Sequence, residues 1–101
     1  MSNRKLLQQK LESILGSSNV YFQPPESTKM NYPAIVYHLN QIENRHAGNI
    51  VYKQSDSYSV TMIDTNPDNT TVRKLAGLPL CRFNNHYRAD NLNHWNYTLY
   101  Y

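Results

Sequence analysis

Residues 58–77 read YSVTMIDTNPDNTTVRKLAG, and three local patterns follow one another in this stretch. Residues 58–63 carry a large apolar side chain at every second position, which is the period of a half-buried strand. Residues 64–69 have the Asp, Asn and Pro content of a turn. Residues 70–76 place apolar side chains on one side of a short helix, which Gly77 ends. The stretch therefore predicts a strand, a turn and a helix.

The elements upstream of this stretch can be predicted in the same way. Leucines and an isoleucine recur at helical spacing over residues 3–15, so we expect an amphipathic helix there. A short strand is expected at residues 20–22. A second strand is expected at 33–39, with apolar groups on both of its faces. Residues 40–57 are mostly polar, with a short strand predicted at 50–52.

Downstream, residues 80–87 and 94–101 predict two more strands, joined through residues 88–93. One face of the last strand is expected to carry Trp95, Tyr97, Leu99 and Tyr101. The whole order predicts a single α+β domain over residues 1–101. Its sheet is expected to be mainly antiparallel or mixed, with the N-terminal helix and the second short helix packed on one face.

The composition limits how large a core the chain can build. The 101 residues suit one domain, but Leu, Ile, Val and Phe together number 22. Tyr contributes nine further residues and Asn contributes 13, so much of the side-chain surface is amphipathic or polar without being charged. We therefore expect a marginal core for an isolated chain.

Charge and cysteine content narrow the functional classes. The net charge of +3 is spread along the chain in no run longer than two, which favours a solvated basic surface over a strong nucleic-acid stripe. The single Cys81 indicates a reducing compartment during folding. The chain has no apolar run of 18 residues, and charges interrupt the leucines of its N-terminal segment. We therefore expect neither a membrane span nor a secretion signal.

Two groups of residues invite a metal hypothesis, and both are weak. Asp64, Asn66 and Asp68 match the first side-chain ligands of a calcium loop, but Asn69 replaces the glycine and Leu75 the bidentate glutamate. The four histidines, at 38, 46, 86 and 94, have no zinc spacing. With the last hairpin centred near residue 90, His86 and His94 are expected opposite each other as a polar cross-strand pair. We expect no metal site.

Nothing in the sequence favours catalysis or a cofactor. Cys81 lies inside a predicted strand, where an inert thiol is usual. With three glycines in the chain, there is neither a phosphate-binding loop nor a dinucleotide fingerprint. We therefore expect a protein that is not an enzyme and that carries no cofactor.

The tyrosine-rich strands allow two interpretations. Tyrosines on a sheet can stack on bases, and a small single-stranded nucleic-acid-binding module would use Tyr97 and Tyr100 in this way. They also suit a half-buried sheet or a subunit interface, where Tyr is enriched. The interface interpretation is favoured, because no RNP-like glycine–aromatic pattern accompanies the tyrosines.

Three strings carry a resemblance to a known family. They read YPAIVY at residues 32–37, YSVTMID with NPD at 58–68, and LPLC at 78–81, continuing through ADNLNHW at 89–95 to the final LYY. Over roughly residues 20–101 the chain resembles the small tail-completion proteins of long-tailed bacteriophages, also described as tail terminators or head-to-tail joining proteins.

The resemblance implies a structural role and a set of partners. Such a protein forms a ring, typically of six subunits, that caps the finished tail tube and joins it to the head connector. It implies a sheet with helices on one face, assembly in the host cytoplasm and residence in the virion. Genomic DNA would pass through the ring with non-specific contacts. An adaptor on the head side of the neck is the nearest alternative. The polar segment 40–57 is the candidate contact with a neighbouring subunit or the tail tube, through Glu43, Arg45, His46, Tyr52 and Lys53.

Overall fold

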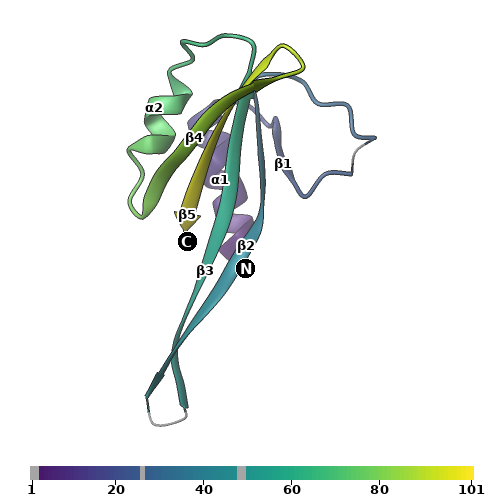
Figure 1. Ribbon diagram of the computed structural model, residues 1–101. Helices are drawn as coiled ribbons and strands as arrows, with labels where there is room; N and C mark the ends of the chain where they lie inside the picture. Colours follow the sequence, from purple (N-terminus) through teal and green to yellow (C-terminus); the bar gives the residue numbers. More distant parts are fainter. Residues whose placement is uncertain (1–2, 26, 48–49) are drawn as a thin grey trace.

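The computed structural model describes residues 3–25, 27–47 and 50–101, with the backbone alone for Asn3 and for residues 43–47 and 50–55. These residues form two helices and five strands (Figure 1): α1 Asn3–Leu15, β1 Val20–Phe22, β2 Ala34–Ala47, β3 Ile50–Asp64, α2 Thr71–Ala76, β4 Cys81–Ala89 and β5 Leu92–Tyr100. The strands make one open sheet in the order β1-β2-β3-β5-β4. The β1–β2 pair is parallel and the other pairs are antiparallel. The predicted α+β fold is confirmed.

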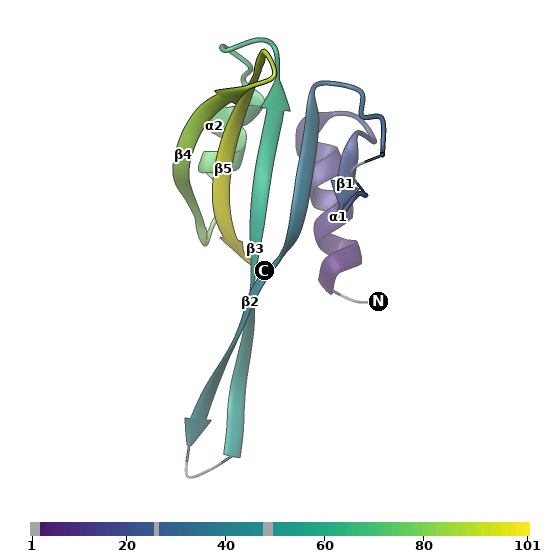
Figure 2. The ribbon, with the colours of Figure 1, turned by 45° about the vertical axis from the view of Figure 1, so that its right-hand side comes forward.

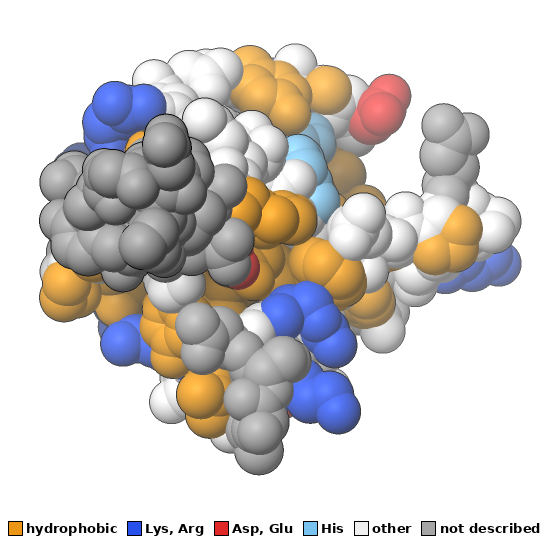
Figure 3. All heavy atoms as spheres, turned by 90° about the horizontal axis from the view of Figure 1, so that it is seen from below, with side chains coloured by type: hydrophobic (Ala, Val, Ile, Leu, Met, Phe, Trp, Pro, Cys, Tyr) orange, Lys and Arg blue, Asp and Glu red, His pale blue; other side chains and the backbone are white. Residues whose placement is uncertain are grey.

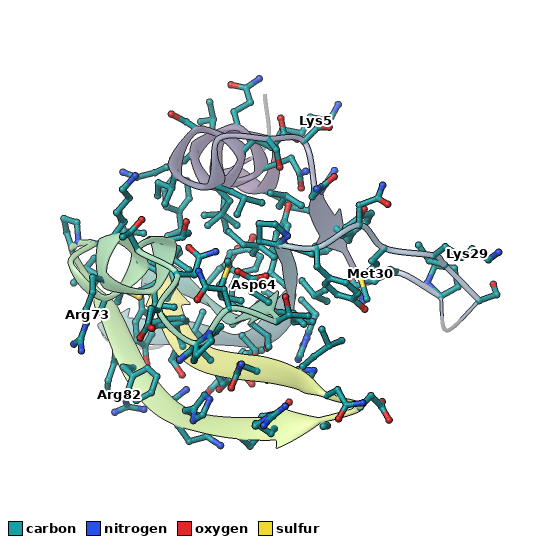
Figure 4. All side chains as sticks on the ribbon, turned by 90° about the horizontal axis from the view of Figure 1, so that it is seen from above. Lys5, Lys29, Met30, Asp64, Arg73 and Arg82 are labelled. Atoms are coloured by element: carbon teal, nitrogen blue, oxygen red, sulfur yellow. The ribbon has the colours of Figure 1, made fainter. Side chains whose placement is uncertain are left out.

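Both helices lie on the same side of the sheet (Figure 4). The strands alternate as their sequence predicts, and β5 buries every second side chain. Leu7 and Leu11 of α1 and Leu75 of α2 pack against this face. The strand residues that they meet are Ile35, Tyr37, Tyr58, Val60, Met62, Trp95, Tyr97 and Leu99. The core is thus a single layer between the helices and the sheet, which is why aromatic side chains supply so much of it.

A partly buried polar contact fixes α1 over the β1–β2 pair. The hydroxyl of Tyr37 donates to Oε1 of Gln8 at 2.6 Å, and Nε2 of Gln8 donates to the carbonyl of Val20 at 2.9 Å. The guanidinium of Arg4 lies 4.6 Å from the centre of the Phe22 ring. These bonds satisfy polar atoms between the helix and the sheet, and they can form at only one position of the helix. They therefore both determine where α1 lies and stabilise it there.

Residues 40–57 differ from the prediction of a polar segment with a short strand. β2 has 14 residues and β3 has 15, and they pair with each other along their length, with bulges near residues 40 and 45. The outer part, residues 40–47 and 50–56, projects beyond the helices as a two-stranded arm (Figures 1 and 2). The molecule therefore measures 51 × 24 × 23 Å. Hydrogen bonds between the two strands satisfy their backbone N–H and C=O groups. The strands can therefore form although their sequence has no apolar alternation.

The last two strands are joined by a tight turn. Asp90 and Asn91 have φ values of 53° and 63°, and β4 and β5 pair from Ala89 and Leu92 outward. Two consecutive residues with positive φ make the hairpin turn that matches the twist of the strands, and Asp and Asn tolerate it. This turn sets the register of the whole hairpin.

The one-layer core predicts a sharp contrast between two adjacent leucines of α1. Leu7 is completely buried, whereas Leu6 is 41% exposed. We expect Leu7→Ala to lower the free energy of unfolding by about 2–5 kcal/mol, because it opens a cavity in the layer. Urea unfolding followed by circular dichroism measures the difference. Leu6→Ala is the matched control, with an expected change below about 1 kcal/mol. Equal losses for both variants would contradict this position of the helix.

Candidate functional site

The predicted contact residues belong to the arm. Glu43, Arg45 and His46 lie in β2, and Tyr52 and Lys53 lie in β3. The register places Arg45 opposite Lys53. Their side chains are outside the described residues, so their role as contacts stays a prediction. What the backbone supplies is their setting, a hairpin that projects away from the core (Figure 2).

The calcium-like residues are engaged in turn chemistry. Asp64 is buried, and its carboxylate accepts from the Thr65 N–H at 2.8 Å and from Nδ2 of Asn69 at 2.6 Å. Oδ1 of Asn66 accepts from the N–H of Asp68 at 3.0 Å. Oδ1 of Asn69 accepts from the N–H of Thr71 and so supports the start of α2. These oxygens hold the turn and the helix together.

The expected pairing of His86 with His94 is wrong. His86 is opposite Trp95 and His94 is opposite Tyr87, because the Asp90–Asn91 turn sets a different register. The His86 ring lies 5.4 Å from that of Trp95 on the helix side, and Nε2 of His86 is 3.0 Å from Oδ1 of Asn93. His94 stacks on Tyr87 at 4.8 Å on the other face. Across the described part of the chain, no three His, Cys, Asp or Glu residues are grouped to hold a metal ion.

The face of the sheet away from the helices carries a hydrogen-bond network that crosses three strands. Nδ2 of Asn96 donates to the hydroxyls of Ser59 and Thr61, each at 3.1 Å. Nδ2 of Asn84 in turn donates to Oδ1 of Asn96 at 2.9 Å and to Oγ1 of Thr98 at 2.8 Å. Two of the 13 asparagines, Asn84 and Asn96, thus link β4, β5 and β3. This network was not predicted from the sequence, although Ser, Thr and Asn at alternating positions of β3 and β5 are the pattern that would indicate it.

Tyr97 is not available for stacking on a base. Its side chain is completely buried on the helix side, and its hydroxyl donates to the Val72 carbonyl at 2.9 Å. Burial, and to a lesser degree the nearby Cys81, raise the pKa of Tyr97 to about 12, against a smaller lowering effect of Arg73. Burial also raises the pKa of the Cys81 thiol, which keeps that sulfur protonated.

A groove lies on the helix side beside the edge strand β4. It is lined by Pro67, Val72, Arg73, Ala76, Phe83, His86 and Trp95, and it encloses about 420 Å³. A second cavity of about 240 Å³ shares Pro67, Val72, Arg73 and Trp95 with it and extends toward the 68–70 turn. Arg73 of α2 is the one cationic side chain among these lining residues (Figure 4). Arg82 of β4 is opposite Thr98 and therefore lies on the face of the sheet away from the helices. The groove is thus an apolar hollow with one arginine, Arg73, in its lining.

Exposed apolar side chains occur near the groove and near the base of the arm. Phe83, in the groove, is 46% exposed, and Leu39 and Ile42, at the base of the arm, are 40% and 51% exposed. From below, hydrophobic side chains reach the surface in several places, interspersed with Lys and Arg (Figure 3). These side chains leave apolar surface accessible at the groove and at the base of the arm.

The buried Tyr97 hydroxyl makes stability sensitive to alkaline pH. An unfolded tyrosine releases its proton near pH 10, whereas folded Tyr97 keeps its proton until about pH 12. The unfolded state binds fewer protons in this interval, so the free energy of unfolding falls as the pH rises from 10 to 12. Tyr97→Phe should make this decline shallower while costing about 1 kcal/mol at pH 7 through the lost bond to Val72.

Chemical unfolding at a series of pH values measures both effects. Tyr87→Phe is the control at pH 7, where we expect little change because that side chain is 46% exposed. A decline of equal slope in wild type and Tyr97→Phe would contradict the assignment.

Comparisons with known proteins add no family to these observations. No protein-family model matches the chain, and no curated protein matches it either. Among the described residues, no helix is long and apolar enough to cross a membrane.

Proposed function

We propose that this protein is a tail-completion protein that assembles into a ring, caps a finished phage tail tube and joins it to the head connector. The observation that carries the proposal is the projecting arm. Residues 40–47 and 50–56 extend beyond the helices that cover the rest of the sheet (Figure 1). Ordering a strand costs about 1–2 kcal/mol per residue in backbone entropy. For a projecting hairpin, contact with a partner is the main interaction that can offset this cost.

The sequence strings support the same function. YPAIVY, YSVTMID with NPD, and the ADNLNHW run resemble the tail-completion family. In the fold these strings lie mainly in β2, β3 and the β4–β5 hairpin, which supply four of the five strands of the sheet, and NPD lies in the turn after β3. The resemblance therefore involves the framework of the domain.

A ring also suits the distribution of polar and apolar surface. A head-to-tail ring needs two different, complementary surfaces on each subunit. The base of the arm and the groove beside β4 are two such surfaces, each with exposed apolar side chains. The partners of the ring would be the tail tube protein on one side and the connector or its adaptor on the other, with DNA in the lumen.

Size-exclusion chromatography with light scattering tests ring formation. We expect a species of about six times the chain mass of 11.8 kDa at micromolar concentration. Electron microscopy of tail tubes from the same virus, mixed with the protein, should show extra density at one end of each tube. A chain that stays monomeric and leaves the tube ends bare would refute the proposal. Binding to head connectors alone would place the protein on the head side of the neck.

A further inference from the structure

We infer that the base of the arm of one subunit seats in the groove beside β4 of the next copy, with Ile42 entering the apolar hollow and Asp56 facing Arg73. This inference rests on the proposed ring, because it names the contact that would close it. The occupant of the groove is thus a second copy of this chain.

The arm supplies an apolar side chain beside an acidic one. Ile42 of β2 is the cross-strand partner of Asp56 of β3, so the two side chains lie next to each other on one face of the hairpin. Asp56 is two residues before the buried Tyr58, which places this pair on the helix side of the sheet. The Asp56 charge is, after burial, the next cause that raises the pKa of Tyr58, in agreement with this position.

The groove supplies the complementary groups. Val72, Ala76, Phe83 and Trp95 form its apolar walls, and Arg73 lies at its rim. Asp68 shares the adjoining cavity with Arg73, but no ion pair involves Arg73 in the described part of the chain. An incoming carboxylate could therefore pair with a guanidinium that has no competing ion pair. His86 also lines the groove, and its contact with Asn93 holds its ring in place. The ring would therefore not have to move when the arm binds.

The two surfaces lie at different levels of the sheet, and the groove extends from Phe83, which is level with Val60, to the turn after β3. Trp95 of the groove pairs with Met62, two residues from the end of β3, and Pro67 lies in the turn that follows. Asp56 is six residues before Met62, which corresponds to about 20 Å along the strand. A chain therefore cannot fill its own groove with its arm, and a head-to-tail contact between copies can.

Disulfide trapping tests this contact. In a Cys81→Ser background, Ile42→Cys is combined with Phe83→Cys. Within one chain β2 and β4 are separated by β3 and β5, about 14 Å across the sheet. That distance exceeds the roughly 7 Å that a disulfide permits between Cα atoms, so any bond formed must join two copies. Oxidation should give a ladder of linked oligomers on a non-reducing gel. Chains with one of the two cysteines, mixed together, should give dimers only.

Two matched variants keep the test specific. Ile42→Cys with Tyr87→Cys is the negative control, because Tyr87 is as exposed as Phe83 but stacks with His94 on the other face of β4. Ile42→Cys with Ala76→Cys samples the opposite wall of the groove without altering β4, and it should also give the ladder. Thermal unfolding of the reduced variants verifies that each one folds.

A charge exchange gives an independent measurement. Asp56→Arg and Arg73→Asp should each raise the concentration for half-assembly about tenfold or more, and the double variant should recover most of that loss. If the wild type forms a ring but neither cysteine pair cross-links and the double variant shows no recovery, this contact is wrong and the ring proposal stands. If the wild type forms no ring at any concentration, both fail.

Discussion

The hydrogen bond from the buried Tyr97 hydroxyl to the Val72 carbonyl joins the short helix to the sheet, and the arrangement of that half of the molecule depends on it. α2 has six residues, too few to be stable as a helix by themselves. Its position comes from burial of Leu75, from this bond and from the Asn69 side chain at its start. Because α2 is held over β5 at this point, space is left beside β4. The groove is a consequence of a short helix that is fixed near its N-terminal end.

Because the helices cover only one side of the sheet, the two faces of the sheet carry different types of side chain. The helix side takes the large apolar and aromatic side chains. On the other side, Asn84 and Asn96 link three strands through hydroxyl and amide groups, so a polar face keeps its hydrogen bonds without a second layer. The use of Asn84 and Asn96 on this face and the small number of aliphatic residues both agree with a sheet that is covered on one side. The charge of +3 plays little part in it.

Sequence patterns predicted those parts of the fold in which one face is buried. The alternation around Val60 and Tyr97 gave the correct faces of β3 and β5, and the spacing of Leu7 and Leu11 gave the buried side of α1. The arm could not be predicted as continuous strands, because no helix covers it and no apolar period marks it. The pairing of His86 failed for another reason: a small change in the position of the turn moves a side chain to the opposite face. The groove could not be predicted either, because it depends on where α2 packs on the sheet, and no local sequence pattern determines that position.

The arm also changes how the marginal core of this chain is interpreted. Residues 40–47 and 50–56 contribute strands but lie outside the layer that α1 and α2 cover, so the body is built from fewer residues than the chain length suggests. A monomer would therefore carry the entropy cost of an ordered hairpin and leave Ile42 and Phe83 in contact with water. In a closed ring each arm would cover a groove and each groove would cover an arm. The apolar area that a single chain cannot bury would then stabilise the subunit and the ring together, so that folding and assembly become thermodynamically linked.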